Sequence, residues 1–266
     1  AQHLPALQLH DPDPDKPDTL VTRLAPALTS RLRPTPERRD PRPLPSNAGL
    51  GFVGSYVLGM GFVLTPDERD ALVRKNPRNA ERIFPYLGGE EVNTNPDQGF
   101  DRYVINFGQM EIAEAERWPD LIKIVREKVK PERDQNNREV RKKYWWRFGE
   151  VAPALYEALS SLHQCIVIAR VTKHSCFSFQ PSDRVIAETL CAFTSPSFST
   201  LAVLQSRLHE SWARLLSSSL EERLRYSVAD CFETFPFPQP DPRTEIPELE
   251  TIGERLYTAR AAYMTA

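Results

Sequence analysis

The distribution of proline constrains most strongly what this chain can form. Ten of its 24 prolines lie in residues 1–45, most of them in the segments DPDPDKP and RLRPTPERRDPRPLP. Proline fixes φ and lacks a backbone N–H, so these segments cannot propagate a helix or a sheet. We therefore predict that residues 1–45 are a proline-rich linker or arm, in which residues 20–28 are the one apolar stretch.

Residues 46–240 alternate between strand and helix patterns, as expected for one principal domain. The run GLGFVGSYVLGMGFVL is typical of short strands with a bulge or a close backbone approach at the glycines. Alternating apolar residues predict a strand in FDRYVINF, and CIVIARVTK, CFSFQ and RVIAETLCAF predict three strands of a meander.

Helix signals separate these strands. Thr65, followed by Pro66 and Glu68, predicts a capped helix start. Further helices are predicted in DLIKIVREKVK and over residues 136–146, 151–162, 200–217 and 220–224. The helix over 200–217 would carry on one face Leu201, Leu204, Leu208, Trp212 and Leu215.

A last amphipathic helix is predicted after the prolines of residues 236–242. Its apolar stripe, which must pack against something, consists of Leu249, Ile252, Leu256, Ala259 and Tyr263. The predicted fold is therefore α+β, with a small mixed or antiparallel sheet flanked by several helices. We predict an arm over residues 1–45, a main domain over 46–240 and a C-terminal amphipathic helix within 241–266.

Charge is segregated along the chain although its sum is small. A net charge of -2 argues against nucleic-acid binding by bulk charge, so any such site must be a local patch. Residues 121–147 carry a local net charge of +6, and Tyr144-Trp145-Trp146 lies near their end. This basic segment predicts either a positive face for DNA or a solvated helix face with ion pairs four residues apart.

Two motifs match patterns found in nucleotide-binding and zinc-binding sites, but their sequence context fits such sites poorly. Gly49 to Gly54 matches G-x-G-x-x-G, but a proline-rich segment precedes it and strand-like sequence follows, which is wrong for a nucleotide site. His163-Gln164-Cys165 and His174-Ser175-Cys176 repeat an H-x-C pattern that could supply zinc ligands. Buried thiols are the commoner explanation, and Cys165, Cys176, Cys191 and Cys231 are expected to be reduced in a cytoplasmic protein.

Six segments in a fixed order carry a family resemblance. The longest is LQSRLHESWARLLSSSLEERLRYSVADCFETFPFP, residues 204–238. It is preceded by GSYVLGMGFVLTP, NPRNAERIFPYLGGEE, DRYVINFG, VKPERDQNNREVRKKYWWRF and IARVTKHSCFSF. Together they resemble the target-recognition region of MmeI-like and related type II restriction-modification, adenine-specific DNA methyltransferases.

The resemblance implies a DNA-reading segment of a larger enzyme. Enzymes of this family bind S-adenosylmethionine, methylate the exocyclic amine of adenine and flip the target base out of the helix, often with a nuclease in the same polypeptide. This chain has no N-P-P-Y-type tetrad, since Asn95-Pro96-Asp97-Gln98 is not one. We therefore expect no catalysis, no cofactor and no metal in this chain, and S-adenosylmethionine in a missing methyltransferase domain of the same polypeptide.

Double-stranded DNA is then the expected partner, together with that missing domain, and a membrane is not. The predicted phosphate contacts are Lys142, Lys143, Arg147 and Lys173. The predicted base readers are Arg170, His174, Gln205 and His209, and Arg225 is a further candidate. Two other functions stay open: a protein-interaction module with acidic, proline-rich ends, and a zinc-binding domain that uses the H-x-C pairs.

Overall fold

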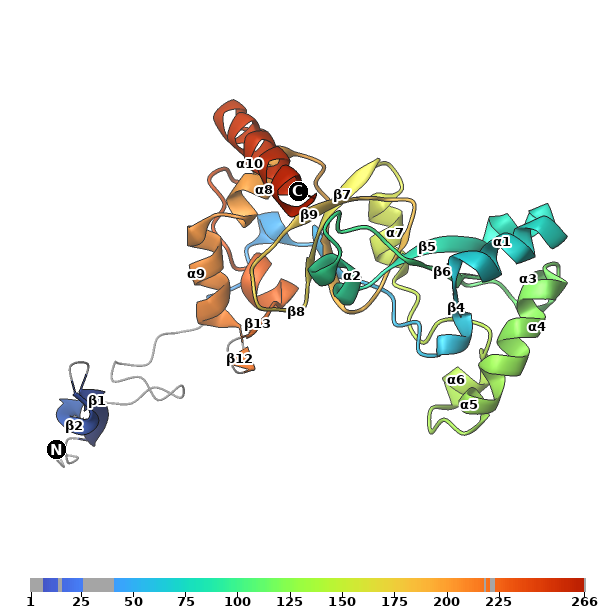
Figure 1. Cartoon of the computed structure of the whole chain (residues 1–266), viewed down its shortest axis with the longest axis horizontal. Coiled ribbons are helices and arrows are strands. Elements are labelled where there is room, and N and C mark those ends of the chain that lie inside the picture. Colours follow the sequence, from blue (N-terminus) through green and yellow to red (C-terminus); the bar gives the residue numbers. More distant parts are fainter. Residues whose placement is uncertain (1–6, 14–15, 26–40, 218, 221–222, 266) are drawn as a thin grey trace. The chain divides into compact units, whose positions relative to one another are not determined.

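The computed structural model describes residues 7–13, 16–25, 41–217, 219–220 and 223–265 (Figure 1). The chain divides into two compact units, Ala1–Arg42 and Pro43–Ala266.

The first unit contains a hairpin of β1 (Leu7–Asp13) and β2 (Lys16–Ala25), paired antiparallel. The prediction of a segment without sheet is therefore wrong for these residues. The reason is the placement of the prolines: Pro12 adjoins a shift in the register and Pro17 lies near the start of β2, so neither interrupts the middle of the hairpin. Residues 26–40 of the predicted arm lie outside the described residues.

The second unit is built around an antiparallel sheet in the order β3-β11-β7-β9. Its strands are β3 (Gly51–Val53), β11 (Leu190–Phe193), β7 (Gln164–Ala169) and β9 (Ser178–Pro181). The predicted meander is wrong, because β7 is central and pairs with both β9 and β11. The run CIVIA explains the central position of β7, because a strand whose two faces are both apolar must be covered by other residues on both faces.

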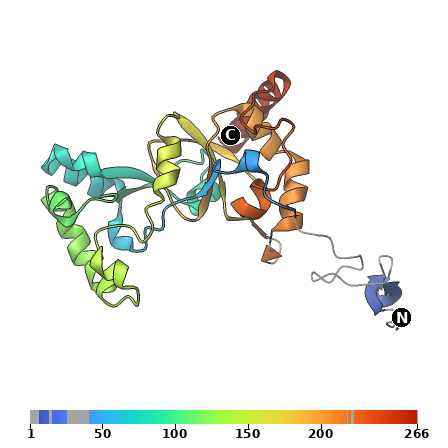
Figure 2. The same cartoon turned by 180° about the vertical axis from the view of Figure 1, so that it is seen from behind.

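Two cores cover the two faces of β7. Ile166 and Ile168 belong to an aromatic core with Phe177, Phe193 and Tyr226. The intervening residues of β7 face a smaller core, to which α7 (Pro153–Leu159) contributes; Figure 2 shows this helix in yellow. The residues of β7 in the smaller core are Cys165, Val167 and Ala169.

A second sheet, in the order β10-β5-β6-β4, belongs to a separate helical core. It consists of β10 (Val185–Ile186), β5 (Ile83–Leu87), β6 (Arg102–Ile105) and β4 (Val63–Leu64), and only the β10–β5 pair is parallel. Its helices are α1 (Pro66–Lys75), α3 (Ile112–Ala115), α4 (Pro119–Lys128), α5 (Lys130–Asp134) and α6 (Glu139–Lys143). The capped start of α1 is confirmed, since Thr65 and Glu68 form a reciprocal capping box.

The last part of the chain differs from its prediction in two places. Residues 200–217 form two helices, α8 (Phe198–Leu204) and α9 (Arg207–Leu216), because the Ser206 hydroxyl accepts a hydrogen bond from His209 N at 3.2 Å and starts a new helix. Leu208 is consequently 79% exposed while Leu204 is buried. The helix predicted over 220–224 is wrong, because β12 (Ser219–Leu220) and β13 (Arg223–Arg225) pair there as strands.

The remaining elements complete a mixed α+β fold, which confirms the predicted class. β8 (Val171–Thr172) joins β12 and β13 in a third sheet, in the order β12-β13-β8. α10 (Pro247–Thr265) packs on α8 (Figure 1). The short elements are η1 (Pro45–Asn47), η2 (Met60–Phe62), η3 (Pro77–Arg82), α2 (Gly89–Thr94) and η4 (Val228–Phe232).

Candidate nucleic-acid interface

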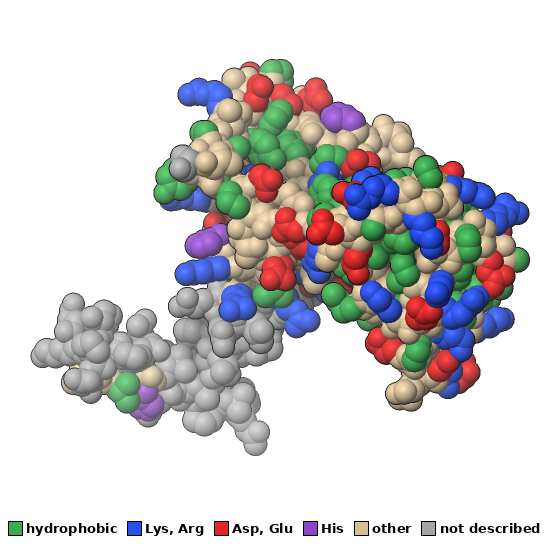
Figure 3. All heavy atoms as spheres, turned by 45° about the vertical axis from the view of Figure 1, so that its right-hand side comes forward, with side chains coloured by type: hydrophobic (Ala, Val, Ile, Leu, Met, Phe, Trp, Pro, Cys, Tyr) green, Lys and Arg blue, Asp and Glu red, His purple; other side chains and the backbone are tan. Residues whose placement is uncertain are grey.

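The basic segment of residues 121–147 is ion-paired along most of its length. The pairs join Lys123 to Glu127, Arg126 to Glu116, Lys128 to Glu68, Lys130 to Asp134, Lys142 to Glu139 and Arg147 to Glu111. Glu68, Glu111 and Glu116 come from outside the segment, so a charge count along the sequence misses them. Figure 3 shows the result on its right-hand side, where Lys and Arg side chains are intermixed with Asp and Glu.

Three predicted phosphate contacts lie at the end of this segment, and their side chains differ in how free they are to contact a phosphate. Lys143 is exposed, with its Nζ 5.2 Å from the centre of the Tyr144 ring, and Lys142 pairs with Glu139 at 2.9 Å. The Arg147 guanidinium donates from Nε to the Met110 carbonyl oxygen at 2.9 Å and pairs with Glu111. Arg147 therefore has a structural role, whereas the ammonium group of Lys143 remains free to meet a phosphate.

The adjacent tryptophans do not offer a stacking surface. Trp145 and Trp146 are both buried in the helical core, and Trp146 Nε1 donates to the Met110 carbonyl oxygen at 2.9 Å. Buried indoles whose N–H groups are satisfied stabilise a core and cannot reach a base. The aromatic cluster is thus part of the packing of the helical core.

Two of the predicted base readers have structural partners at the α8–α9 junction. The Gln205 side chain accepts from Phe177 N at 3.0 Å and donates to the Ser175 carbonyl oxygen at 2.6 Å. His209 is fully buried, and its Nε2 lies 2.8 Å from the Tyr226 hydroxyl. Burial lowers the pKa of His209 to about 3, so the ring is neutral near pH 7.

A third predicted reader, Arg170, is directed toward the protein. Its Nη1 donates to the Glu188 carbonyl oxygen at 3.0 Å and to the Tyr56 hydroxyl at 3.3 Å. Its own carbonyl oxygen accepts from Tyr226 N at 2.8 Å. Arg170 thus ties the end of β13 to the main sheet.

Lys173 and His174 lie in a different setting, on an exposed basic strand pair. The antiparallel register sets Arg225 opposite Val171 and Leu224 opposite Thr172, and Lys173 and His174 follow in the bend after β8. Leu224 and Thr172 are buried, so Arg223 and Arg225, which alternate with Leu224, face solvent. We call the exposed side chains of β13 and of the bend after β8 the basic ribbon; its members are Lys173, His174, Arg223 and Arg225.

The basic ribbon is electrostatically unfavourable by itself. Arg223 and Arg225 lie two residues apart on the exposed face of β13, and their like charges repel each other. Among the residues that the structure describes, none of the four ribbon side chains forms an ion pair. Glu221 and Glu222 precede β13 and lie outside the described residues. An arrangement of this kind favours an anionic ligand.

Hydrogen bonds from the body of the domain hold the ribbon in place. The Thr172 hydroxyl donates to Asn93 Oδ1 at 3.0 Å, and Asn93 Nδ2 donates to the Val171 carbonyl oxygen at 3.2 Å. At the end of β13, Tyr226 enters the aromatic core and meets His209. The ribbon is therefore a fixed surface and not a loop tip, as precise recognition requires.

The sequence pattern did not indicate Arg223 as a DNA contact, because it predicted a helix where the structure has strand β13. The signal was present in RLRYS, where Arg223 and Arg225 alternate with Leu224 and Tyr226. Period-two alternation of charged and apolar residues is typical of a half-buried strand. Only the pairing with β8 brings Lys173, in the bend after that strand, next to β13.

The glycine run of residues 49–54 serves backbone packing. A Cβ at Gly54 would lie 2.5 Å from the Ala187 carbonyl carbon and closer still to two carbonyl oxygens. Gly54 N donates to the Leu190 carbonyl oxygen at 3.2 Å. The close approach is thus to another strand of the protein and not to a pyrophosphate.

We predict that Gly54→Ala lowers the free energy of unfolding by about 3 kcal/mol or more, because backbone atoms cannot move away from the added methyl group. Denaturant unfolding of the two proteins measures the difference. Gly49→Asn is the matched control: Gly49 has φ +72° with open space around a Cβ, and asparagine tolerates this region. Equal losses in the two variants would contradict the packing explanation.

The H-x-C pairs are not assembled into a metal site in the described residues. Cys165 lies in the smaller core, where burial raises its pKa to about 12, while His163 is exposed. Cys176 Sγ lies 3.5 Å from Gln98 Nε2, and His174 belongs to the basic ribbon. No group of three or more metal-ligating side chains occurs in the described part of the chain.

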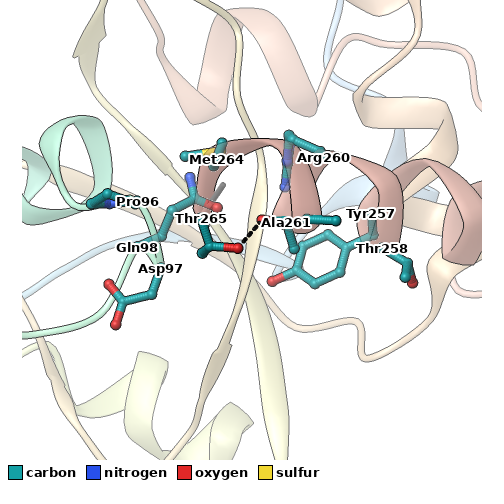
Figure 4. Close-up of a pocket in the computed structure, with 10 residues that line it drawn as sticks. Pro96, Asp97, Gln98, Tyr257, Thr258, Arg260, Ala261, Met264 and Thr265 are labelled. Atoms are coloured by element: carbon teal, nitrogen blue, oxygen red, sulfur yellow. Dashed lines mark hydrogen bonds between the residues drawn. The ribbon is translucent and has the colours of Figure 1, made fainter.

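A cavity of about 400 Å³ lies beside the last turns of α10 (Figure 4). Figure 4 shows Asp97 and Gln98 on one side, from the turn before β6, and Tyr257 and Arg260 from α10 on the other. The Arg260 guanidinium donates to Gln205 and to the Phe177 carbonyl oxygen, so it is not free for an anion. This cavity adds no candidate for DNA binding.

No helix in the described part of the chain combines the length and apolar content needed to cross a bilayer.

Comparisons with known proteins agree on one family. The family described as "MmeI, target recognition domain" matches residues 43–239. A solved structure of the Type IIL restriction-modification enzyme MmeI in complex with DNA is similar in fold, with a TM-score of 0.70 and 16% sequence identity. The similarity covers 100% of this chain and 34% of that chain, so this chain spans about a third of the length of the solved enzyme. A comparison with curated proteins finds no match.

Proposed function

Because this chain belongs to the MmeI target recognition domain family, we propose that it binds double-stranded DNA and reads a specific sequence. The similar solved enzyme was in complex with DNA, which supports this partner. We propose further that the chain acts within a longer type II restriction-modification polypeptide, an adenine-specific DNA methyltransferase. Catalysis and S-adenosylmethionine binding then belong to the rest of that polypeptide, and this chain supplies neither a catalytic residue nor a cofactor site.

The observation that carries the proposal is the basic ribbon. The major groove of B-DNA admits a two-stranded β-ribbon, and β13 lies in a small antiparallel sheet with β8 and β12 and carries Arg223 and Arg225 on its exposed face. Phosphates would relieve the repulsion among the cationic side chains of the basic ribbon. The ribbon therefore gains from DNA both a matching shape and a matching charge.

The ribbon residues divide into two roles. We assign base reading to Arg223 and Arg225, because a guanidinium can donate two hydrogen bonds to guanine O6 and N7. We assign phosphate contact to Lys173, since a lysine acts as a point charge. His174 follows Lys173 at the exposed turn and is assigned to either a base edge or a phosphate.

Lys142 and Lys143 are proposed as additional phosphate contacts. Lys143 is exposed, and the surface pair between Lys142 and Glu139 costs little to open. Arg147, Arg170 and Gln205 are left out of the proposed interface because their side chains form hydrogen bonds inside the protein, and His209 is left out because it is fully buried. A cytoplasmic location fits a DNA partner and the four free cysteines.

The proposed function is tested by DNA binding as a function of salt. The chain, and the longer polypeptide that contains it, are titrated with duplexes of random sequence between 50 and 200 mM salt, and bound duplexes are sequenced. We expect affinity to fall steeply with salt and one sequence to be enriched. Weak binding without salt dependence and without enrichment, in both proteins, would rule out sequence-specific DNA recognition.

A further inference from the structure

α10 is fixed to the body of the domain along one face only. The Glu250 carboxylate accepts hydrogen bonds from Phe198 N at 3.0 Å and Ser199 N at 2.6 Å, at the start of α8. Gly253 is buried, and a Cβ there would lie 2.9 Å from the Phe198 carbonyl carbon. Tyr257 accepts from Phe179 N at 3.3 Å. These contacts define the packed face of the helix.

A second face of α10 is apolar and lies in solvent. Ile252 is 55%, Leu256 43% and Tyr263 86% exposed, and Ala259 is exposed as well. The stripe predicted from the sequence is therefore not the face that packs on α8. We call these four residues the α10 seam. Contiguous exposed apolar side chains of this kind mark interaction sites.

The spacing within the α10 seam indicates what kind of partner it fits. From Leu249, which is half-buried, the apolar positions follow at intervals of three, four, three and four residues. This is the seven-residue repeat by which one helix packs its knobs into the holes of another. A repeat of 3.5 residues gives a narrow stripe suited to a second helix at a shallow crossing angle.

The charges beside the α10 seam argue against a second copy of this chain as the partner. Glu248 and Arg255 border the seam on its free side, and both are exposed. An antiparallel copy that covers the whole stripe would bring the two Arg255 side chains together. A parallel copy would set Arg255 opposite the Arg260 of the other chain. Both arrangements juxtapose like charges, which oppose pairing.

A helix from elsewhere in a longer polypeptide avoids this conflict. The family match ends at residue 239, whereas the structural similarity includes the whole of α10 within an enzyme about three times as long. We propose that the α10 seam docks one amphipathic helix from another part of the same longer polypeptide, with an acidic side chain opposite Arg255. This inference rests on the proposed function, because it requires the longer enzyme.

Cysteine accessibility tests the proposal directly. Three native cysteines, Cys165, Cys191 and Cys231, are buried, so an introduced exposed thiol reacts over a low background. Ala259→Cys places a thiol in the α10 seam, and Thr251→Cys places one on an exposed position of the same helix outside it. Reaction rates with a thiol reagent are compared between the 266-residue chain and the longer polypeptide.

We expect the Ala259→Cys thiol to react at least about tenfold more slowly in the longer polypeptide than in the chain alone, because burial limits thiol access. Thr251→Cys should react equally in both. Equal rates for Ala259→Cys would overturn the proposal. So would protection in the chain alone that increases with its concentration, since this indicates a second copy.

The DNA titration separates this inference from the proposed function. Protection of Ala259→Cys without sequence-specific DNA binding would support the docked helix and refute the proposed DNA recognition. DNA binding without protection would refute the docked helix alone.

Discussion

Replacing Arg225 by alanine is expected to weaken binding to the preferred duplex by about 5- to 150-fold, the cost of about 1–3 kcal/mol for one base-reading arginine. Arg225 is exposed on β13, and no protein partner holds its guanidinium among the residues that the structure describes. Competition between the preferred duplex and a scrambled one measures the effect. Because the lost contact is to a base, affinity for the scrambled duplex changes much less.

Two further variants serve as controls for the Arg225→Ala result. Lys173→Ala should weaken binding to both duplexes alike and reduce the slope of log affinity against log salt by about one, as expected for a phosphate contact. Arg74→Ala removes an exposed arginine from α1 and should change neither measure. Equal loss for both duplexes with Arg225→Ala would assign Arg225 to the backbone and not to a base.

Acid is expected to destabilise the domain through His209. Burial lowers the pKa of this histidine from 6.5 to about 3 in the folded state, so below pH 6.5 the unfolded chain binds a proton that the folded one does not. The stabilisation is complete above pH 6.5 and is lost progressively toward pH 3. Between pH 7 and pH 5 the expected loss is about 2 kcal/mol.

Denaturant unfolding at several pH values measures this dependence, and His209→Gln isolates it from the other titrating groups. The amide of glutamine can approach the Tyr226 hydroxyl without titrating, so the variant should lose about 2 kcal/mol less than the wild type over the same range. A wild-type slope in His209→Gln would show that folding does not lower the pKa of His209.

Local sequence patterns predicted elements where short-range chemistry decides the structure. The capped helix start at Thr65 is an example, because its hydrogen bonds join residues three apart. The strand predicted in FDRYVINF is likewise present as β6. The capping bonds are local, whereas β6 needs β4 and β5 as partners and only its alternating pattern is local.

Sequence patterns predicted the wrong secondary structure where a single residue or a distant strand determined which element forms. Ser206 ended one helix and started another, which turned Leu208 outward and His209 into the aromatic core. Arg223–Arg225 form strand β13 through pairing with β8, some fifty residues earlier in the chain. Apolar spacing alone could not predict this pairing, since it does not encode which strand lies alongside.

The candidate interface likewise combines features that residue type predicts with features that only the fold decides. Lys173, His174 and Arg225 were predicted as DNA contacts from their residue types, and all three are exposed in the fold. Arg147 and Gln205 instead form hydrogen bonds with partners distant in the sequence, and His209 is fully buried, so the proposed interface omits them. Residue type indicates which chemistry a side chain can perform, whereas exposure depends on what packs against it.

The sequence by itself determined the mixed α+β class and the family, through segments that occur in a fixed order between residues 43 and 239. Only the tertiary structure decided where positive charge is available. Acids from other elements pair with the basic segment of residues 121–147, and the pairing of β8 with β13 brings Lys173 close to Arg223 and Arg225. The physical reason is that electrostatic interactions depend on distance in space, and folding sets those distances.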